Sequence, residues 1–277
     1  MAEASTRSAP PSAEDVIGDA VAVAEAAGPV ALRYFRRALD VEDKSGGQRF
    51  DPVTRADREV ESRIREELER RFPDHGIVGE EHAERVSDSA CRWIIDPIDG
   101  TRAFISGFPA WGILLGYTVD GVPRAGVLHQ PYLGETFYGA GDRAVLRRGG
   151  EEIRLRTSAT AELADAVLYC THPSMYERRA EIDRFDALAG RVRLPRFGGD
   201  CYSYGLLAHG LVDLVVEGAM QPYDIVPLIP IVEAAGGIVT TWDGGDASGG
   251  GLVLAAANRS LHAQALEILR GAAPPIP

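Results

Sequence analysis

The stretch that decides the fold is Trp93-Ile-Ile-Asp-Pro-Ile-Asp-Gly-Thr-Arg-Ala-Phe-Ile-Ser-Gly-Phe-Pro109. Its first three residues are an apolar run that predicts a buried strand, and we expect this strand to stop at Asp96. A second carboxylate, Asp99, follows three residues later, after a proline that restricts the backbone between the two. Gly100 then permits a sharp turn. The two carboxylates therefore leave a rigid strand through a constrained turn and can converge on one point.

Converging carboxylates are what a hard divalent cation such as Mg²⁺ needs, because it takes oxygen ligands in an octahedral arrangement. A helix is predicted to open at Gly100-Thr101, and its free N–H groups and positive dipole end would face the same point. Spacing alone leaves a solvated turn as the alternative, since Asp-Pro and Asp-Gly are common turn dipeptides. The carboxylates and the helix start together indicate a metal-assisted phosphate site.

The composition is that of an ordinary globular protein, with 277 residues, 45% hydrophobic and 25% charged. We expect a disordered tail at 1–12, an N-terminal α+β half at 13–150 that carries the metal and phosphate signature, and a C-terminal α/β half at 151–277 that completes the site. The net charge of −12 disfavours nucleic acid and anionic membranes as partners. No apolar run approaches the roughly 20 residues that span a bilayer.

The cysteines indicate a reducing compartment. Cys91, Cys170 and Cys201 are odd in number and lack C-x-x-C spacing, which fits reduced thiols in a cytoplasmic protein. The N-terminal segment has no basic-then-apolar pattern, so we expect neither a signal peptide nor an organelle transit sequence.

Hydrophobic periodicity predicts a layered α/β or α+β architecture. We expect one long helix over 13–38, a mobile loop or loose hairpin over 41–50, a hairpin with a primed turn at Asp120-Gly121, a charged turn over 142–152 and a helix over 225–235. The first half is rich in antiparallel strands, and the second half alternates strands with helices.

Several acidic residues outside the central stretch have ordinary structural explanations. Thr54 and Asp57 have capping-box spacing ahead of a helix, and Asp224, just before another helix, fits an N-cap. The pair Glu80-Glu81 is typical of a solvated surface, whereas Asp51 lies upstream of the cap and is not explained by it.

Four ordered blocks resemble the signatures of the inositol monophosphatase family of Mg²⁺-dependent, lithium-sensitive phosphatases. They are Asp51-Pro-Val-Thr, Gly79-Glu-Glu, Asp96-Pro-Ile-Asp-Gly-Thr101 and Tyr223-Asp-Ile-Val. The resemblance covers about residues 15–265 and implies that family's αβαβα sandwich with mixed sheets. The family usually has Trp where Tyr223 stands and an alanine-glycine pair in place of Val226-Pro227, which leaves the shape of that helix start open.

The resemblance also implies a site that binds two or three Mg²⁺ ions and hydrolyses a small-molecule phosphate monoester. Catalytic roles fall to Asp51, Thr101 and Glu80, with Asp51 and Thr101 orienting and deprotonating the attacking water. The implied metal ligands are Glu80, Asp96, the carbonyl of Ile98, Asp99 and Asp224, and the implied phosphate donors are the N–H groups of Gly100 and Thr101. Lys44 and Trp111 are further candidates, with Trp111 either a lid or stacking residue or part of the core.

The resemblance also implies that Asp200, Glu217 and Asp224 contact the alcohol portion of the substrate. Inositol-directed members usually carry a small residue at the position of Asp200, and a pair of carboxylates suits a cationic group better than a neutral polyol. A loop carboxylate that only bonds nearby backbone N–H groups is the alternative for Asp200.

The local strings Gly198-Gly-Asp-Cys-Tyr202 and Pro222-Tyr-Asp-Ile-Val226 resemble the histidinol-phosphate phosphatase branch. We therefore expect hydrolysis of L-histidinol phosphate to L-histidinol in histidine biosynthesis. The alternatives are an inositol-1-monophosphatase, then a nucleotide 3′-phosphatase or fructose-bisphosphatase. Outside the enzymes, the alternative is a catalytically silent, cation-binding regulatory dimer. A homodimer is a family expectation.

Overall fold

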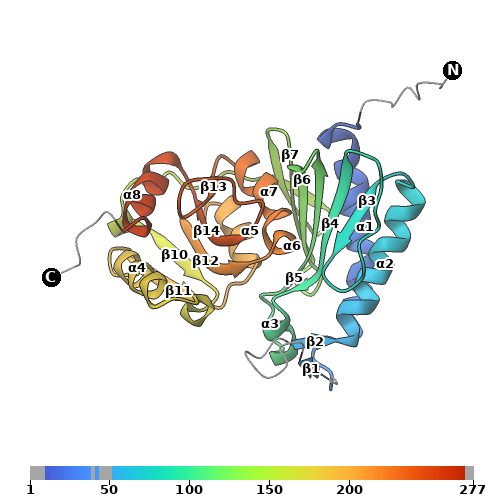
Figure 1. The fold of residues 1–277 in the computed structure, drawn as a ribbon, viewed down its shortest axis with the longest axis horizontal. Coiled ribbons are helices and arrows are strands. Elements are labelled where there is room, and N and C mark those ends of the chain that lie inside the picture. The colour runs from blue at the N-terminus through green and yellow to red at the C-terminus, as the bar shows by residue number, and fades with distance from the viewer. Residues whose placement is uncertain (1–9, 39–40, 44–51, 272–277) are drawn as a thin grey trace.

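Two mixed β-sheets alternate with three layers of helices in the computed structural model, which describes residues 10–38, 41–43 and 52–271 (Figure 1). The layers run α, β, α, β, α, so the αβαβα sandwich implied by the sequence is confirmed. Among the described residues, no helix has the length and apolar character needed to cross a lipid bilayer.

The first sheet has seven strands in chain order, with β3 parallel to β4 and every other pair antiparallel. Its strands are β3 (Gly76–Gly79), β4 (Cys91–Asp99), β5 (Gly112–Val119), β6 (Val122–Gln130), β7 (Glu135–Ala140), β8 (Arg143–Arg148) and β9 (Glu151–Arg154). Strands β5 and β7 are buried along almost their whole length because helices cover both faces of this sheet.

The second sheet has five strands in the order β11-β10-β12-β14-β13. Strands β11 and β12 run parallel to β10, and β14 runs antiparallel to both β12 and β13. The strands are β10 (Val167–Cys170), β11 (Leu194–Phe197), β12 (Leu214–Met220), β13 (Ile238–Thr241) and β14 (Gly251–Ala256).

The helices divide among three layers. Helices α1 (Ala13–Leu32) and α2 (Arg55–Arg71) cover the outer face of the first sheet. Between the sheets lie α5 (Tyr202–Ala208), α6 (Pro222–Ile225) and α7 (Leu228–Ala234), and the outer face of the second sheet carries α4 (Arg179–Ala189) and α8 (Arg259–Leu269). The shorter elements are α3 (Thr101–Ser106), the 3₁₀ turns η1 (Leu163–Asp165) and η2 (Pro173–Met175), and the paired strands β1 (Val41–Asp43) and β2 (Pro52–Thr54).

Two local predictions are confirmed in detail. Asp120 and Gly121 have φ values of 51° and 78°, as a primed hairpin turn requires. The side chain of Thr54 accepts a hydrogen bond from the backbone N–H of Ala56, and Asp57 Oδ2 accepts one from the Thr54 N–H at 2.8 Å. This capping box fixes the start of α2 against β2.

Other boundaries differ from the prediction. Helix α1 ends at Leu32 rather than 38, and Ser12, which we placed in a tail, is its N-cap. The predicted charged turn over 142–152 contains β8, because its apolar centre, Ala144, Val145 and Leu146, is buried. The predicted helix over 225–235 is instead α6 followed by α7, with Pro227 between them. Strand β9 belongs to the first sheet but lies wholly beyond the predicted boundary at residue 150, and the division into two halves stays a prediction.

Candidate active site

A cavity of about 330 Å³ contains every described residue that the sequence predicted to bind metal or phosphate. Its walls come from the end of β4 and the start of α3 on one side, and from β12, α6 and the loop before α5 on the other. The predicted residues in its lining are Glu80, Asp96, Ile98, Asp99, Gly100, Thr101, Asp200, Glu217 and Asp224.

The end of β4 brings Asp96 and Asp99 to the same place. The strand continues to Asp99, rather than stopping at Asp96 as we predicted. In a regular strand, residues three apart point to opposite faces of the sheet. Asp96 pairs with Leu114 and Asp99 with Gly112, so β4 carries one extra residue between them and this bulge reverses the alternation. As a result, carboxylate oxygens of Asp96, Asp99 and Asp224 lie within 4.8 Å of one another.

Backbone N–H groups orient each of these three carboxylates. Asp96 Oδ1 accepts a hydrogen bond from Ile98 at 3.0 Å, and Asp99 Oδ2 accepts one from Cys201 at 2.8 Å. Asp224 Oδ2 accepts one from Gln221 at 2.7 Å. Asp224 therefore occupies the third position of α6 rather than the N-cap position that we predicted. These bonds hold the cluster in a fixed arrangement before any ligand binds.

Glycine is required at position 100 for two reasons. Its φ is +80°, a region that other residues rarely adopt, and a β-carbon there would lie 3.1 Å from both the Ala110 carbonyl oxygen and the β-carbon of Asp200. The turn therefore sits directly against the loop that carries Asp200. Beyond it, Thr101 opens α3, and its Oγ1 donates a hydrogen bond to the Ile98 carbonyl at 3.1 Å.

The electrostatics of the cluster call for a cation. Burial raises the pKa of Asp96 well above its usual range, and the charges of Glu80, Asp99 and Asp224 raise it further. Burial also raises the pKa of Asp99 to about 7, with Asp224 adding to the shift and the Cys201 hydrogen bond opposing it. Enclosed carboxylates that repel one another are stabilised when a cation binds among them. Because every donor is an oxygen, the cluster fits a hard cation such as Mg²⁺.

Asp200 and Glu217 form a second acidic pair in the same cavity. Glu217 Oε1 accepts hydrogen bonds from the Thr171 N–H at 2.8 Å and the Thr171 hydroxyl at 3.0 Å. Burial raises the pKa of Glu217 to about 8. Burial likewise raises the pKa of Asp200 to about 7, where the charge of Asp99 adds to the shift and Arg102 opposes it.

The remaining candidates lie elsewhere. Trp111 is fully buried and packs between Phe35 and Phe104, with ring centroids 5.2 Å and 4.8 Å away. It is therefore part of the hydrophobic core between the first sheet and helices α1 and α2, and not a lid over the cavity. Asp51 and Lys44 lie outside the described residues.

Sequence reasoning missed three groups that shape the site. Cys201 and Thr171 hold Asp99 and Glu217 partly through backbone N–H groups, which leave no trace in a sequence motif. Glu61, on α2, accepts hydrogen bonds from the loop that follows Gly79. It is completely buried, although Arg58 and Arg65 stand about one helical turn to either side of it in the sequence.

Comparison with known proteins agrees with this geometry. A sequence model of the inositol monophosphatase family matches residues 12–272. The protein named bifunctional phosphatase IMPL2, chloroplastic, from Arabidopsis thaliana is 38% identical over 259 residues, which are 90% of this chain and 73% of that protein. A histidinol-phosphatase from Chlorobaculum parvum is 37% identical over 243 residues, 87% of this chain and 92% of that protein.

Solved structures agree as well. An inositol monophosphatase from Zymomonas mobilis superposes with a TM-score of 0.82 at 37% identity, and the match covers 95% of this chain and 100% of that one. The match over nearly the whole sequence, together with the acidic cavity, leads to one conclusion: this chain belongs to the inositol monophosphatase family.

Proposed function

We propose that this protein is a Mg²⁺-dependent phosphatase that hydrolyses L-histidinol phosphate to L-histidinol, a step of histidine biosynthesis. Its family acts on small phosphate monoesters, and its similar relatives are named phosphatases. The choice of substrate depends on one observation, the presence of Asp200 and Glu217 in the cavity that holds the acidic cluster.

A buried carboxylate is costly unless a positive group or hydrogen-bond donors compensate it. Glu217 has the two Thr171 hydrogen bonds, yet its pKa remains raised to about 8. A cationic substrate would compensate this pair of carboxylates. Histidinol phosphate carries an ammonium and an ionisable imidazole, whereas inositol phosphate presents only neutral hydroxyls. The name of the Chlorobaculum relative supports the same choice.

The residues that would hold the metal are Glu80, Asp96, the Ile98 carbonyl, Asp99 and Asp224. Two or three Mg²⁺ ions bound there would supply positive charge opposite the phosphate and lower the pKa of a coordinated water.

The chain's own groups would do the rest. The N–H groups of Gly100 and Thr101, at the start of α3, would donate to the phosphate oxygens. The Thr101 hydroxyl, held by the Ile98 carbonyl, would orient the attacking water. Asp51 is proposed as its proton acceptor.

The proposal is tested by measuring phosphate release from a panel of substrates at saturating Mg²⁺. The panel would contain L-histidinol phosphate, myo-inositol 1-phosphate, fructose 1,6-bisphosphate and a nucleotide 3′-phosphate. We expect the highest kcat/KM with L-histidinol phosphate and no turnover after treatment with EDTA. A preference for inositol phosphate would reject the histidinol assignment and favour the inositol alternative.

We also propose that the protein is a cytoplasmic homodimer. Cys91, Cys170 and Cys201 are all buried and free, which is typical of proteins in a reducing compartment. The dimer is an expectation from the family resemblance. Light scattering after size-exclusion chromatography would give the mass directly, and a monomer mass would reject this part of the proposal.

A further inference from the structure

We propose that Glu61 is a positioning residue that fixes the loop carrying Glu80 in its metal-binding place. The inference rests on the proposed function, in which Glu80 helps to hold Mg²⁺. Glu61 lies on α2 and is completely buried, but it is not part of the cavity lining. Its effect would therefore pass through the loop.

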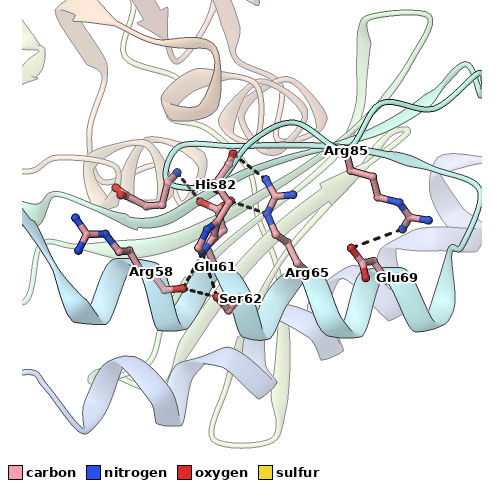
Figure 2. A network of polar contacts seen from close by, with 8 residues as sticks. Arg58, Glu61, Ser62, Arg65, Glu69, His82 and Arg85 are labelled. Atoms are coloured by element: carbon pink, nitrogen blue, oxygen red, sulfur yellow. Dashed lines mark hydrogen bonds and ion pairs between the residues drawn. The ribbon is translucent and has the colours of Figure 1, made fainter.

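The carboxylate of Glu61 holds the two peptide N–H groups that directly follow Glu80 (Figure 2). Glu61 Oε2 accepts from the Glu81 N–H at 2.7 Å, and Oε1 accepts from the His82 N–H at 3.3 Å. Hydrogen bonds from backbone N–H groups to a buried, charged acceptor are among the stronger ones in proteins. They satisfy Glu61 and fix the chain on the C-terminal side of Glu80.

The same carboxylate also contacts the chain on the other side of Glu80. A β-carbon at Gly79 would lie only 2.0 Å from Glu61 Oε1, so the carboxylate occupies the space that any larger residue would need. The φ of Gly79 is not positive, and the close approach of Glu61 is therefore the reason for glycine here. Glu61 touches both neighbours of Glu80 in the chain.

Other side chains of α2 complete the support. Arg65 Nε donates to Glu61 Oε1 at 2.7 Å, and its Nη2 donates to the His82 carbonyl at 3.2 Å. His82 Nε2 lies 3.1 Å from Ser62 Oγ and 3.2 Å from the Arg58 carbonyl oxygen. Figure 2 shows these groups along one side of the helix, facing the loop.

At its C-terminal end, near Arg85, the loop is held by backbone hydrogen bonds to β3. The Arg85 N–H donates to the Ile77 carbonyl at 2.8 Å, and the Ile77 N–H donates to the Arg85 carbonyl at 3.1 Å. From Glu80 to Glu84 the chain forms no helix or strand, so Glu61 and Arg65 supply the order that secondary structure would otherwise give.

Loop order matters here because Glu80 faces the acidic cluster. Glu80 lines the cavity, and its charge is among the groups that raise the pKa of Asp96. A ligand on an irregular loop binds tightly only when the loop is already ordered, since ordering it on binding costs conformational entropy. Residues that orient metal ligands typically change metal affinity or activity by 10–100-fold when substituted.

The test is a calorimetric titration of the full-length, metal-free protein with Mg²⁺. Glu61→Gln keeps the size of the side chain but removes its charge and one of its two acceptor oxygens. We expect it to weaken Mg²⁺ binding by about 10–100-fold. Glu66→Gln is the matched control, because Glu66 is on the same helix, 70% exposed and paired only loosely with Arg63 at 3.6 Å. Its Mg²⁺ affinity should equal that of the wild type.

A double-variant cycle separates positioning from general stability. If Glu61 acts through Glu80, then Glu61→Gln should cause no further loss of Mg²⁺ affinity in a Glu80→Gln background. In steady-state assays, Glu61→Gln should raise the Mg²⁺ concentration needed for half-maximal rate and leave the KM for substrate unchanged at saturating Mg²⁺. Gly79→Ala gives an independent check, because the added methyl group fits only if the loop and the Glu61 carboxylate move apart, while the chemistry of Glu61 is unchanged. We expect it to weaken Mg²⁺ binding too.

Unchanged Mg²⁺ affinity in Glu61→Gln, or an equal loss in the presence and absence of Glu80, would overturn the inference. If circular dichroism shows that Glu61→Gln does not fold, the Mg²⁺ titration of Gly79→Ala becomes the deciding test. Wild-type Mg²⁺ affinity in Gly79→Ala would then overturn the inference. The titration needs no substrate. Mg²⁺ binding without histidinol phosphate hydrolysis would therefore reject the substrate assignment alone, whereas absence of Mg²⁺ binding by the wild type would reject both.

Discussion

The metal-free protein should lose stability as the pH rises from 5 to 8, and Asp99→Asn should remove part of that loss. The pKa of Asp99 is raised from its ordinary value of 3.8 to about 7 in the folded protein, first by burial and then by the charge of Asp224. The folded state therefore binds a proton that the unfolded state has already released. The stability contributed by this proton is complete below pH about 4 and is lost as the pH rises through 7.

The size of the effect follows from the shift. Between pH 5 and pH 7, Asp99 is protonated in the folded protein and ionised in the unfolded chain. Over this range the free energy of unfolding falls by about 1.4 kcal/mol for each pH unit. The loss is at most on the order of 3 kcal/mol, and water in the cavity would reduce it. For a domain of this size, 3 kcal/mol corresponds to roughly 6–12 °C in Tm. Glu217 and Asp200 have raised pKa values too, so their contributions have the same sign.

Scanning calorimetry in EDTA would measure Tm for the wild type and for Asp99→Asn at several pH values. The relevant quantity is the difference in Tm between the two proteins, because the contributions of titratable groups that both proteins share cancel in it. His129 is such a group: burial lowers its pKa to about 4, so its contribution has the opposite sign between about pH 4 and 6.5. Parallel curves for the two proteins would refute the reasoning. Saturating Mg²⁺ should raise the wild-type Tm more at pH 8 than at pH 5, since proton release accompanies metal binding.

Three further predictions concern catalysis. Asp96→Asn and Asp99→Asn should each abolish phosphate release while circular dichroism remains that of the folded protein; near-normal turnover would contradict the assignment of both as metal ligands. Thr101→Ala should lower kcat by roughly 10²-fold or more with little change in KM, as steady-state kinetics would show, and a change confined to KM would mean that Thr101 only binds phosphate. Asp200→Asn and Glu217→Gln should each lower kcat/KM for L-histidinol phosphate by about 10–150-fold, the loss of one charge-assisted contact, but barely affect a small aryl phosphate; equal losses on both substrates would assign these carboxylates to the metal site.

The sequence predicted the layers and the six carboxylates of the cavity because both depend on side-chain identity. Apolar runs separated by turn residues define β5 and β6, and the acidic motifs mark Asp96, Asp99 and Asp224, which lie in one cavity. The bulge in β4 was not predictable in the same way. It depends on how β4 pairs with β5, and the pairing register is a property of two strands that no single motif contains.

The burial of polar residues on helices was also not predictable from the sequence. Val60, Ile64 and Leu68 repeat at helical spacing along α2, and nothing in that pattern distinguishes Glu61 from the exposed glutamates of the same helix. Both Asp57 and Glu61 nevertheless face inward. Asp57 caps its own helix, and Glu61 accepts hydrogen bonds from a loop far along the chain. Periodicity identifies the face that is apolar, but it does not reveal a carboxylate that is buried because a backbone segment far along the chain needs an acceptor.

The charge balance of the cavity links metal binding to phosphate binding. Six carboxylates line it, and Arg102 is the one basic side chain among the described residues of its wall. A phosphate dianion entering this cavity alone would be repelled by those carboxylates that are ionised, and the N–H groups at the start of a short helix could offset little of that repulsion. Cations bound among Asp96, Asp99 and Asp224 would reverse the local sign. If the proposed function holds, the same carboxylates would make phosphate binding depend on Mg²⁺, and Asp200 and Glu217 would remain available for the positive end of the substrate.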